Sequence, residues 1–176
     1  MSVELVPVGD LATRTAAEAL IREYLQFIAG TALERYRLTF DIEAMIASDL
    51  HDESKFFPPA GRFYVVRHGG AFVGVGCLRR VAPGMAEIQR MYVRPQARGL
   101  GAGRALVERL IADARGMQFT TMRLESLKAL SAAHALYRSV GFHEIAPYGE
   151  SSMTNYQSAE ALATYKSSAL FMELTL

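Results

Sequence analysis

The chain has 176 residues, 19 of them basic and 18 acidic, and its formal net charge is +1. This length predicts one domain, residues 1–176, with a core large enough to fold without disulfides or metal ions. Charges of both signs are spread along the chain, which argues against nucleic acid as a partner. No stretch is apolar enough to cross a bilayer and the N-terminal residues lack a signal-peptide pattern, so we expect a cytoplasmic protein with no membrane partner.

The single cysteine, Cys77, lies in an apolar, strand-like run. It cannot form a bridge within the chain, which fits a reducing compartment. No histidine or helix start lies beside it in the sequence to lower its pKa, so a small buried hydrophobe is favoured over a nucleophile.

The first 60 residues predict one strand and two helices. A strand at 3–8 precedes a helix that begins near Asp10 or Thr13, carries apolar residues at helical spacing and ends at Gly30. A second helix is predicted at 41–49. Two prolines and a glycine interrupt residues 51–61, so we interpret that segment as a loop.

The remaining chain predicts a sheet with one crossover. Strands at 62–68, 71–81 and 86–93 follow one another through tight turns, which is typical of an antiparallel meander. A glycine loop and a helix at 103–114 lead to a strand at 120–125, and this crossover should make the strands at 86–93 and 120–125 parallel. A helix at 131–140, a strand at 142–145, a polar segment at 147–167 and a last strand at 168–174 follow.

These elements predict an α/β (α+β) fold: a mixed, mostly antiparallel sheet with a central parallel pair and helices on both faces. Ligands of such sheets bind where neighbouring strands separate, and the glycine loop marks that place. The C-terminal residues LFMELTL alternate imperfectly, so the last strand is also a candidate for pairing across a homodimer.

The glycine loop, RGLGAG from Arg98 to Gly103, leaves an apolar strand and enters an amphipathic helix. Glycines remove side chains that would keep a phosphate away, and the helix N-terminus and nearby arginines favour a diphosphate there. Glycines before a helix are also a plain structural device, so the loop alone leaves both interpretations open.

The sequence does not match two other phosphate-binding motifs. A P-loop needs a lysine after its last glycine, where this chain has Arg104. A dinucleotide fingerprint needs Gly or Ala five residues after its first glycine, and the chain has Arg104 or Leu106 there. The pattern that remains is RxxGxG, preceded by a strand that ends in MYVRP.

At these residues the chain resembles the GNAT superfamily of N-acetyltransferases. Residues 133–145, AHALYRSVGFHEI, are similar to that superfamily's second acyl-CoA segment, which usually ends in LYxxxGF. The resemblance covers about residues 61–146. One departure is Leu130, which stands where the superfamily often has an asparagine that positions the pantetheine arm, and Ser131 or Ser126 are the candidate replacements.

The resemblance implies an acyl-CoA N-acyltransferase fold and acetyl-CoA as co-substrate, with no metal. It implies transfer of the acetyl group to a primary amine of a small molecule by direct attack in a ternary complex. Two alternatives stay open: a protein or peptide N-terminal acetyltransferase, which needs an open groove, and a non-catalytic acyl-CoA-binding module. The cofactor-binding residues implied are Met91, Tyr92, Val93, Arg98, Gly99, Leu100, Gly101, Ala102, Gly103, Arg104, Ser131 and His134.

Acetyl transfer to an amine needs a base, a polarised carbonyl and an acid for the departing thiolate. Tyr137 is the candidate acid, because a phenol with a pKa of about 10 can donate a proton without ionising at neutral pH. Glu87 is the candidate base, with Glu125 as second choice; a structural ion pair of Glu87 with Arg90 or Arg123 is the competing interpretation.

The acceptor is expected to enter opposite the cofactor, between the early helices and the polar segment near the C-terminus. Candidate contacts there are Tyr24, Phe27 and Tyr148. No two histidines have the spacing of a helical metal site, so no metal is predicted.

Overall fold

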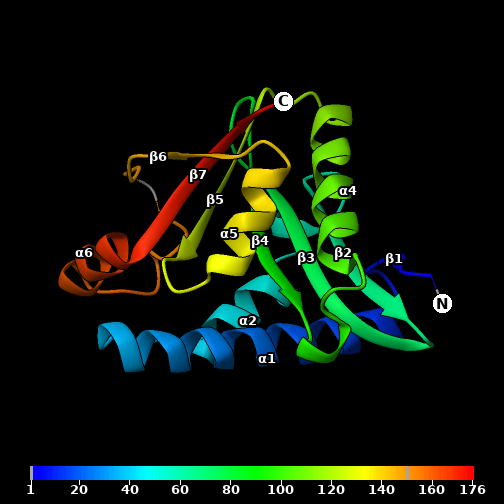
Figure 1. Ribbon diagram of the computed structural model, residues 1–176, viewed down its shortest axis with the longest axis horizontal. Coiled ribbons are helices and arrows are strands. Elements are labelled where there is room, and N and C mark those ends of the chain that lie inside the picture. Colours follow the sequence, from blue (N-terminus) through cyan, green and yellow to red (C-terminus); the bar gives the residue numbers. More distant parts are fainter. Residues whose placement is uncertain (1, 150) are drawn as a thin grey trace.

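The computed structural model describes residues 2–149 and 151–176. They form a seven-stranded sheet in the order β1-β2-β3-β4-β5-β7-β6 (Figure 1). The strands are β1 (Glu4–Pro7), β2 (Gly61–His68), β3 (Ala71–Ala82), β4 (Met85–Val93), β5 (Thr121–Leu127), β6 (His143–Ile145) and β7 (Ala169–Thr175). The helices are α1 (Leu11–Tyr36), α2 (Ile42–His51), α3 (Glu53–Phe56), α4 (Ala102–Gly116), α5 (Ser131–Ser139) and α6 (Ala159–Ser168).

The strand directions confirm the mixed sheet predicted from the sequence. The pairs β1–β2, β2–β3, β3–β4, β5–β7 and β6–β7 are antiparallel, and β4–β5 is parallel. The parallel pairing is short, from Met85 opposite Thr121 to Glu87 opposite Arg123. Beyond it β4 and β5 diverge toward α1, which creates an opening in the middle of the sheet (Figure 1).

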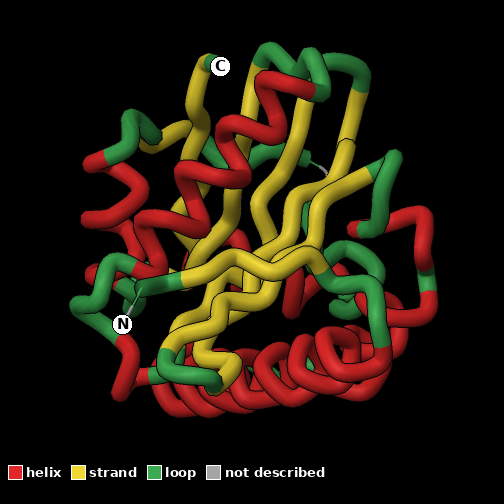
Figure 2. The backbone as a smooth tube through the Cα atoms, turned by 90° about the vertical axis from the view of Figure 1, so that its right-hand side faces the viewer, coloured by secondary structure: helices red, strands yellow, loops and turns green. Residues whose placement is uncertain are grey.

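Apolar side chains cover both faces of the sheet. Residues of α1, α2 and α6 form one core with the β2, β3 and β7 side chains of that face, and residues of α4 and α5 form the other. Figure 2 shows the strands as a central layer with helices on both sides. The buried stripe of α4, which includes Leu106, Leu110 and Ala114, agrees with the helical spacing in the sequence.

A bulge interrupts β4 next to the opening. The register against β3 shifts between Val75, which opposes Tyr92, and Cys77, which opposes Gln89. Arg90, inside the bulge, has a φ of 57°, in the left-handed region that a residue with a side chain seldom adopts. Such a bulge bends the strand and changes the direction of the following groups, and here it separates the end of β4 from β5.

Two helical predictions were wrong. Helix α1 does not end at Gly30 but continues to Tyr36, with Ala32 buried beyond the glycine. A glycine inside a helix costs only about 1 kcal/mol, which the burial of this face offsets. The segment 51–61, predicted as a loop, contains the short helix α3, in which the Asp52 side chain accepts a hydrogen bond from the backbone N–H of Ser54.

The C-terminal region also differs from the prediction. The polar segment 147–167 contains α6, whose first turn is capped by the Ser158 side chain and which buries Tyr165. Strand β7 lies between β5 and β6 and pairs with both. The interpretation that the last strand pairs with a second copy is therefore wrong. Across residues 2–149 and 151–176, every helix is too short or too polar for a membrane span.

Candidate active site

The start of α4 lies beside the end of β4, where a Cβ atom on Gly103 would come within 4.0 Å of Val93, and its first backbone N–H groups have no partner inside the helix. Gly101, at the cap position, has φ 82° and ψ −1°, and within the described chain no side chain caps this helix. The first N–H groups of a helix have no partner inside it, and the dipole makes that end attractive to anions. Gly99 also has a positive φ, of 78°, so the predicted loop has the backbone form that only glycine adopts at low cost.

Both arginines of the loop, Arg98 and Arg104, form hydrogen bonds with neighbouring groups. Arg98 donates from Nε to the carbonyl of Val93 at 3.2 Å, and Arg104 donates to Glu108 and to Ser139 at 2.8 Å. Leu100 and Ala102 complete the loop; Leu100 is exposed and Ala102 is buried. The groups of this loop that can bind an anion are therefore mainly its backbone N–H groups, and a guanidinium group lies at each end of the loop.

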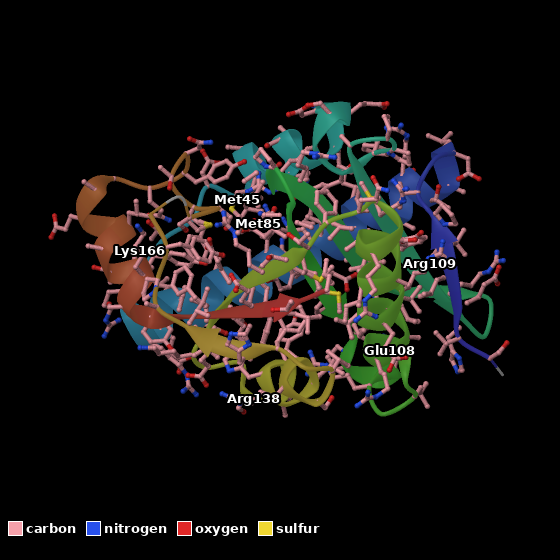
Figure 3. All side chains as sticks on the ribbon, turned by 90° about the horizontal axis from the view of Figure 1, so that it is seen from above. Met45, Met85, Glu108, Arg109, Arg138 and Lys166 are labelled. Carbon is pink, nitrogen blue, oxygen red and sulfur yellow. The ribbon has the colours of Figure 1, made fainter. Side chains whose placement is uncertain are left out.

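The two predicted acyl-CoA segments lie against each other. A Cβ atom added to Gly103 would come within 3.2 Å of Leu136 Cδ2 on α5. Glu108 on α4 and Arg138 on α5 lie on one side of the sheet, and Met45 of α2 lies on the other (Figure 3). The structure thus joins segments that are about 30 residues apart in the sequence into one wall of the opening.

The end of β4 forms the second wall. Met91, Tyr92 and Val93 lie after the bulge and are partly buried; Tyr92 and Val93 pair with β3, and in the described part of the chain none of the three pairs with β5. Their main-chain groups on the β5 side are consequently available to a ligand. The Tyr92 ring packs against the Tyr24 ring of α1, with centroids 5.9 Å apart.

Tyr137 is buried on the inner face of α5. Its ring packs edge-on against Phe142, with centroids 5.9 Å apart. Burial raises its pKa well above the usual value of about 10, and the Tyr24 phenol adds to the shift. Tyr137 therefore keeps its proton at neutral pH, as a proton donor must.

His134 and Ser131 lie earlier on α5. His134 is buried, its Nε2 lies 3.0 Å from Ser126 Oγ, and burial together with Arg138 lowers its pKa. Ser131 is exposed at the first residue of the helix, whose cap position holds Leu130 without a side-chain bond in the described chain. Ser126, the other serine considered for the missing asparagine, is thus engaged with His134.

Glu87 is 1% exposed and lies in a polar network on the α1 side of the sheet. It pairs with Arg79 at 3.1 Å and Arg123 at 3.3 Å. It also accepts hydrogen bonds from Gln89 Nε2 and, at 3.3 Å, from the Tyr148 hydroxyl. The ion pair with Arg123 anticipated from the sequence is present, whereas Arg90 pairs elsewhere. The burial needed for a basic role is present as well.

A cavity of about 50 Å³ lies beside this network. Its walls come from α1, α2, β4, β5, α6 and residues 152–153, and Tyr24 is among them. Phe27 is 45% exposed and lies outside its lining. Tyr148 borders the network, with its ring 3.8 Å from the Arg123 guanidinium carbon and 4.9 Å from the Phe171 ring centre.

The match to known proteins agrees with this geometry. The model of the acetyltransferase (GNAT) family matches residues 17–142. This chain belongs to the GNAT family. An uncharacterized N-acetyltransferase of Schizosaccharomyces pombe is 34% identical over 139 residues, which cover 77% of this chain and 80% of that protein. An IAA acetyltransferase of Azospirillum brasilense is 35% identical over 118 residues, covering 66% and 76%.

A solved structure of similar fold carries the cofactor. The PaiA N-acetyltransferase of Thermoplasma acidophilum, in complex with coenzyme A, aligns over 100% of both chains with a TM-score of 0.67 and 16% identity. As a GNAT protein, this chain is an acyltransferase enzyme of the N-acetyltransferase type, and its fold is one that uses acetyl-CoA. The uncapped start of α4 and its positive-φ glycines fit a diphosphate.

The cofactor fit can be tested at Gly101. Gly101→Val is expected to weaken acetyl-CoA binding about tenfold or more, because a β-branched residue at a φ of 82° is strained and shifts the N–H groups of the GNAT loop. Isothermal titration calorimetry measures the affinity. The control is Leu100→Ala, at an exposed neighbour. An equal affinity loss in both variants would contradict the role given to the loop backbone.

Two parts of this GNAT site were not predicted. Asp49 of α2 is fully buried and pairs with Arg90 of the bulge and with Lys55 of α3. Nothing in the sequence links residues that are 41 positions apart. Gln89, beside Glu87 in the network, had a usable signal: the two polar residues are two positions apart in an otherwise apolar stretch, so they share one face of the buried strand.

Two further predictions concern reactivity. Cys77 is buried, as predicted, and burial raises the pKa of its thiol, so it does not supply a nucleophile. Among the described histidines, cysteines, aspartates and glutamates, no group of three or more is arranged to hold a metal ion.

Proposed function

We propose that this enzyme transfers an acetyl group from acetyl-CoA to a primary amine of a small molecule, by direct attack in a ternary complex. The observation that carries the proposal is the opening between β4 and β5. The uncapped start of α4 borders it on one side of the sheet, and the cavity borders it on the other. A donor and an acceptor bound there can meet without leaving the protein.

The donor side would bind acetyl-CoA mainly through the main chain. When bound, acetyl-CoA supplies an activated acetyl group as a thioester. The N–H groups from Arg98 to Arg104 hold the diphosphate, and the main chain of Met91 to Val93 holds the pantetheine arm and polarises the carbonyl. Ser131 and His134 flank this arm from α5.

The acceptor side favours a small molecule over a protein terminus. Met153, Ser152 and Tyr165, from the C-terminal loop and α6, line the cavity together with α1 residues. This cover supports an enclosed site, whereas a polypeptide acceptor needs an open groove. Tyr24 contacts the acceptor inside the cavity, and Tyr148 and the exposed Phe27 are the proposed contacts around it.

Tyr137 and Glu87 are the proposed acid and base. Tyr137 protonates the departing thiolate. Glu87 receives the amine proton through the Tyr148 hydroxyl, which already donates to Glu87 Oε2. Arg79 and Arg123 lie at ion-pair distance from the Glu87 carboxylate and hold it in place beside the cavity.

The experiment that tests the activity is a thiol-release assay with acetyl-CoA and a panel of amines, amino acids and peptides. The proposal expects thiol release that depends on a small primary amine and rises in proportion to enzyme. Release only with peptides would favour N-terminal acetylation instead. Acetyl-CoA binding without release from any acceptor would favour a non-catalytic module.

The role of Glu87 predicts a changed pH profile. Because a base must be deprotonated, kcat of the parent at saturating amine is expected to fall at low pH, and Glu87→Gln should lower kcat about 100-fold and remove that acid limb. Glu125→Gln, a matched change on the neighbouring strand, should keep the limb. A parent-like profile in Glu87→Gln, or loss of the limb in Glu125→Gln instead, would exclude Glu87 as the base.

The proposed compartment is the cytoplasm. Its support is Cys77, which is buried and unbridged, as expected of a chain that functions under reducing conditions.

A further inference from the structure

Gln89 holds a buried hydrogen-bond acceptor without a partner. The side chain is 8% exposed, and its Nε2 donates to Glu87 Oε1. Its Oε1 atom has no hydrogen-bond partner among the described residues. Buried polar atoms of this kind are rare, because an unsatisfied acceptor loses its hydration without compensation.

The orientation of this amide is set by its neighbour. Glu87 forms ion pairs with Arg79 and Arg123, and a carboxylate in an ion pair only accepts hydrogen bonds. Rotating the Gln89 amide by 180° would place its oxygen against that carboxylate, which is repulsive. The Oε1 atom is therefore held away from Glu87 and available to a donor, and Glu87 acts on it as a positioning residue.

A second carboxylate, already satisfied by four donors, lines the same cavity. Glu125 receives hydrogen bonds from Ser151 Oγ, from the N–H and Oγ of Ser152, and from the Tyr165 hydroxyl, at 2.8 to 3.0 Å. All four of these donors are uncharged. Glu87, by contrast, contacts two guanidinium groups. Glu125 thus contributes a negative charge to a cavity in which Gln89 contributes an unpaired carbonyl oxygen.

A wider and more polar space lies next to the cavity. This vestibule, of about 300 Å³, shares Gln89 and Ser152 with the cavity, and its lining includes Ser48, Lys55, Arg79 and Asn155. The inner cavity of about 50 Å³ has room for about three or four water-sized groups, enough for an amino group and its first carbon atoms. The rest of an acceptor must extend into the vestibule.

From this arrangement we infer that the acceptor is a hydrophilic primary amine that donates one N–H to Gln89 Oε1 and one to the Tyr148 hydroxyl oxygen, which relays a proton to Glu87, with its polar body in the vestibule. This inference rests on the proposed function. A neutral primary amine has two N–H groups and a lone pair, so both acceptors are satisfied while the lone pair stays free to attack. A neutral N-methyl amine has one N–H group and leaves one acceptor unpaired. The two acceptors therefore select for primary amines over secondary amines.

The test uses three amines of matched length: glucamine, N-methylglucamine and hexylamine. Thiol release from acetyl-CoA gives kcat and KM for each. The parent is expected to show a kcat/KM for glucamine about tenfold or more above that for either other amine. Equal efficiency with N-methylglucamine, or with hexylamine, would overturn the inference.

The residue assignment is tested with Gln89→Met, which keeps the length of the side chain and removes its acceptor. This change should lower kcat/KM for glucamine about tenfold, mainly through KM, and reduce the glucamine to N-methylglucamine ratio to about two or less. The control is Gln26→Met on the exposed face of α1, which should leave both values unchanged. A preserved ratio in Gln89→Met would overturn the assignment.

Two further measurements keep the test decisive. If Gln89→Met does not fold, Tyr148→Phe, which removes the acceptor of the second N–H group, should show the same loss of preference for glucamine, and an unchanged preference there would contradict the inference. If the parent releases no thiol with any amine, the proposed function fails. Ligand-observed NMR with coenzyme A present then decides the inference, because glucamine binding must be weaker in the variant than in the parent, and equal binding overturns it.

Discussion

Tyr137→Phe is expected to lower kcat about 100-fold while the Kd of acetyl-CoA changes less than about twofold. The substitution removes one oxygen atom and keeps the ring that packs against Phe142. Because burial raises the pKa of Tyr137, the phenol is fully protonated across the usual assay range, and its removal leaves the departing thiolate without its donor. Steady-state kinetics and calorimetric titration of acetyl-CoA measure the two quantities.

The matched control is Tyr64→Phe. Tyr64 is also a buried phenol, but its hydroxyl donates to Asp113 near the C-terminal end of α4, far from the helix start at the opening. Its loss should leave kcat nearly unchanged. Equal kcat values for the parent and Tyr137→Phe would remove Tyr137 from the mechanism and leave it as a packing residue.

Asp49→Ala is expected to lower the free energy of unfolding by about 3–5 kcal/mol, the usual cost of removing one partner from a buried ion pair. Asp49 is fully buried and contacts Arg90, which is 8% exposed, and Lys55, at 2.5 Å. Burial alone acts to lower the pKa of Arg90, and the Asp49 carboxylate reverses that effect and raises it. The variant would leave a buried guanidinium uncompensated, inside the bulge that shapes the opening.

Urea unfolding followed by circular dichroism measures this loss. Glu43→Ala serves as the control on the same helix, because Glu43 is exposed and its pair with Arg22 should contribute only about 0–1 kcal/mol. Asp49→Asn, which keeps an acceptor oxygen, should fall between the two. A similar loss in Asp49→Ala and Glu43→Ala would show that the bulge does not depend on this carboxylate.

Local sequence signals predicted the donor side of the site. Gly99 and Gly101 adopt positive φ angles because the loop turns directly into α4, and this requirement is visible in the spacing of the glycines. The parallel pairing of β4 and β5 followed from the helix between them. These features depend on residues that are close together in the sequence, so a short sequence segment was enough to predict them.

The acceptor side depends on residues that are far apart. Asp49 and Arg90 lie 41 positions apart, and Ser151 and Tyr165 reach Glu125 from the polar segment at 147–167, in which no helix was predicted. Neither pattern has a local signal, because the partners meet only when α2, α6 and the sheet have packed together. Helix α1 likewise continues past Gly30 because tertiary burial of Ala32 outweighs a weak local preference.

The most direct measurement of the central claim, that donor and acceptor meet in the opening between β4 and β5, is initial-rate kinetics with acetyl-CoA and the best amine both varied. A ternary complex predicts double-reciprocal lines that intersect. Parallel lines would indicate an acetyl-enzyme intermediate and would contradict direct attack in a shared site.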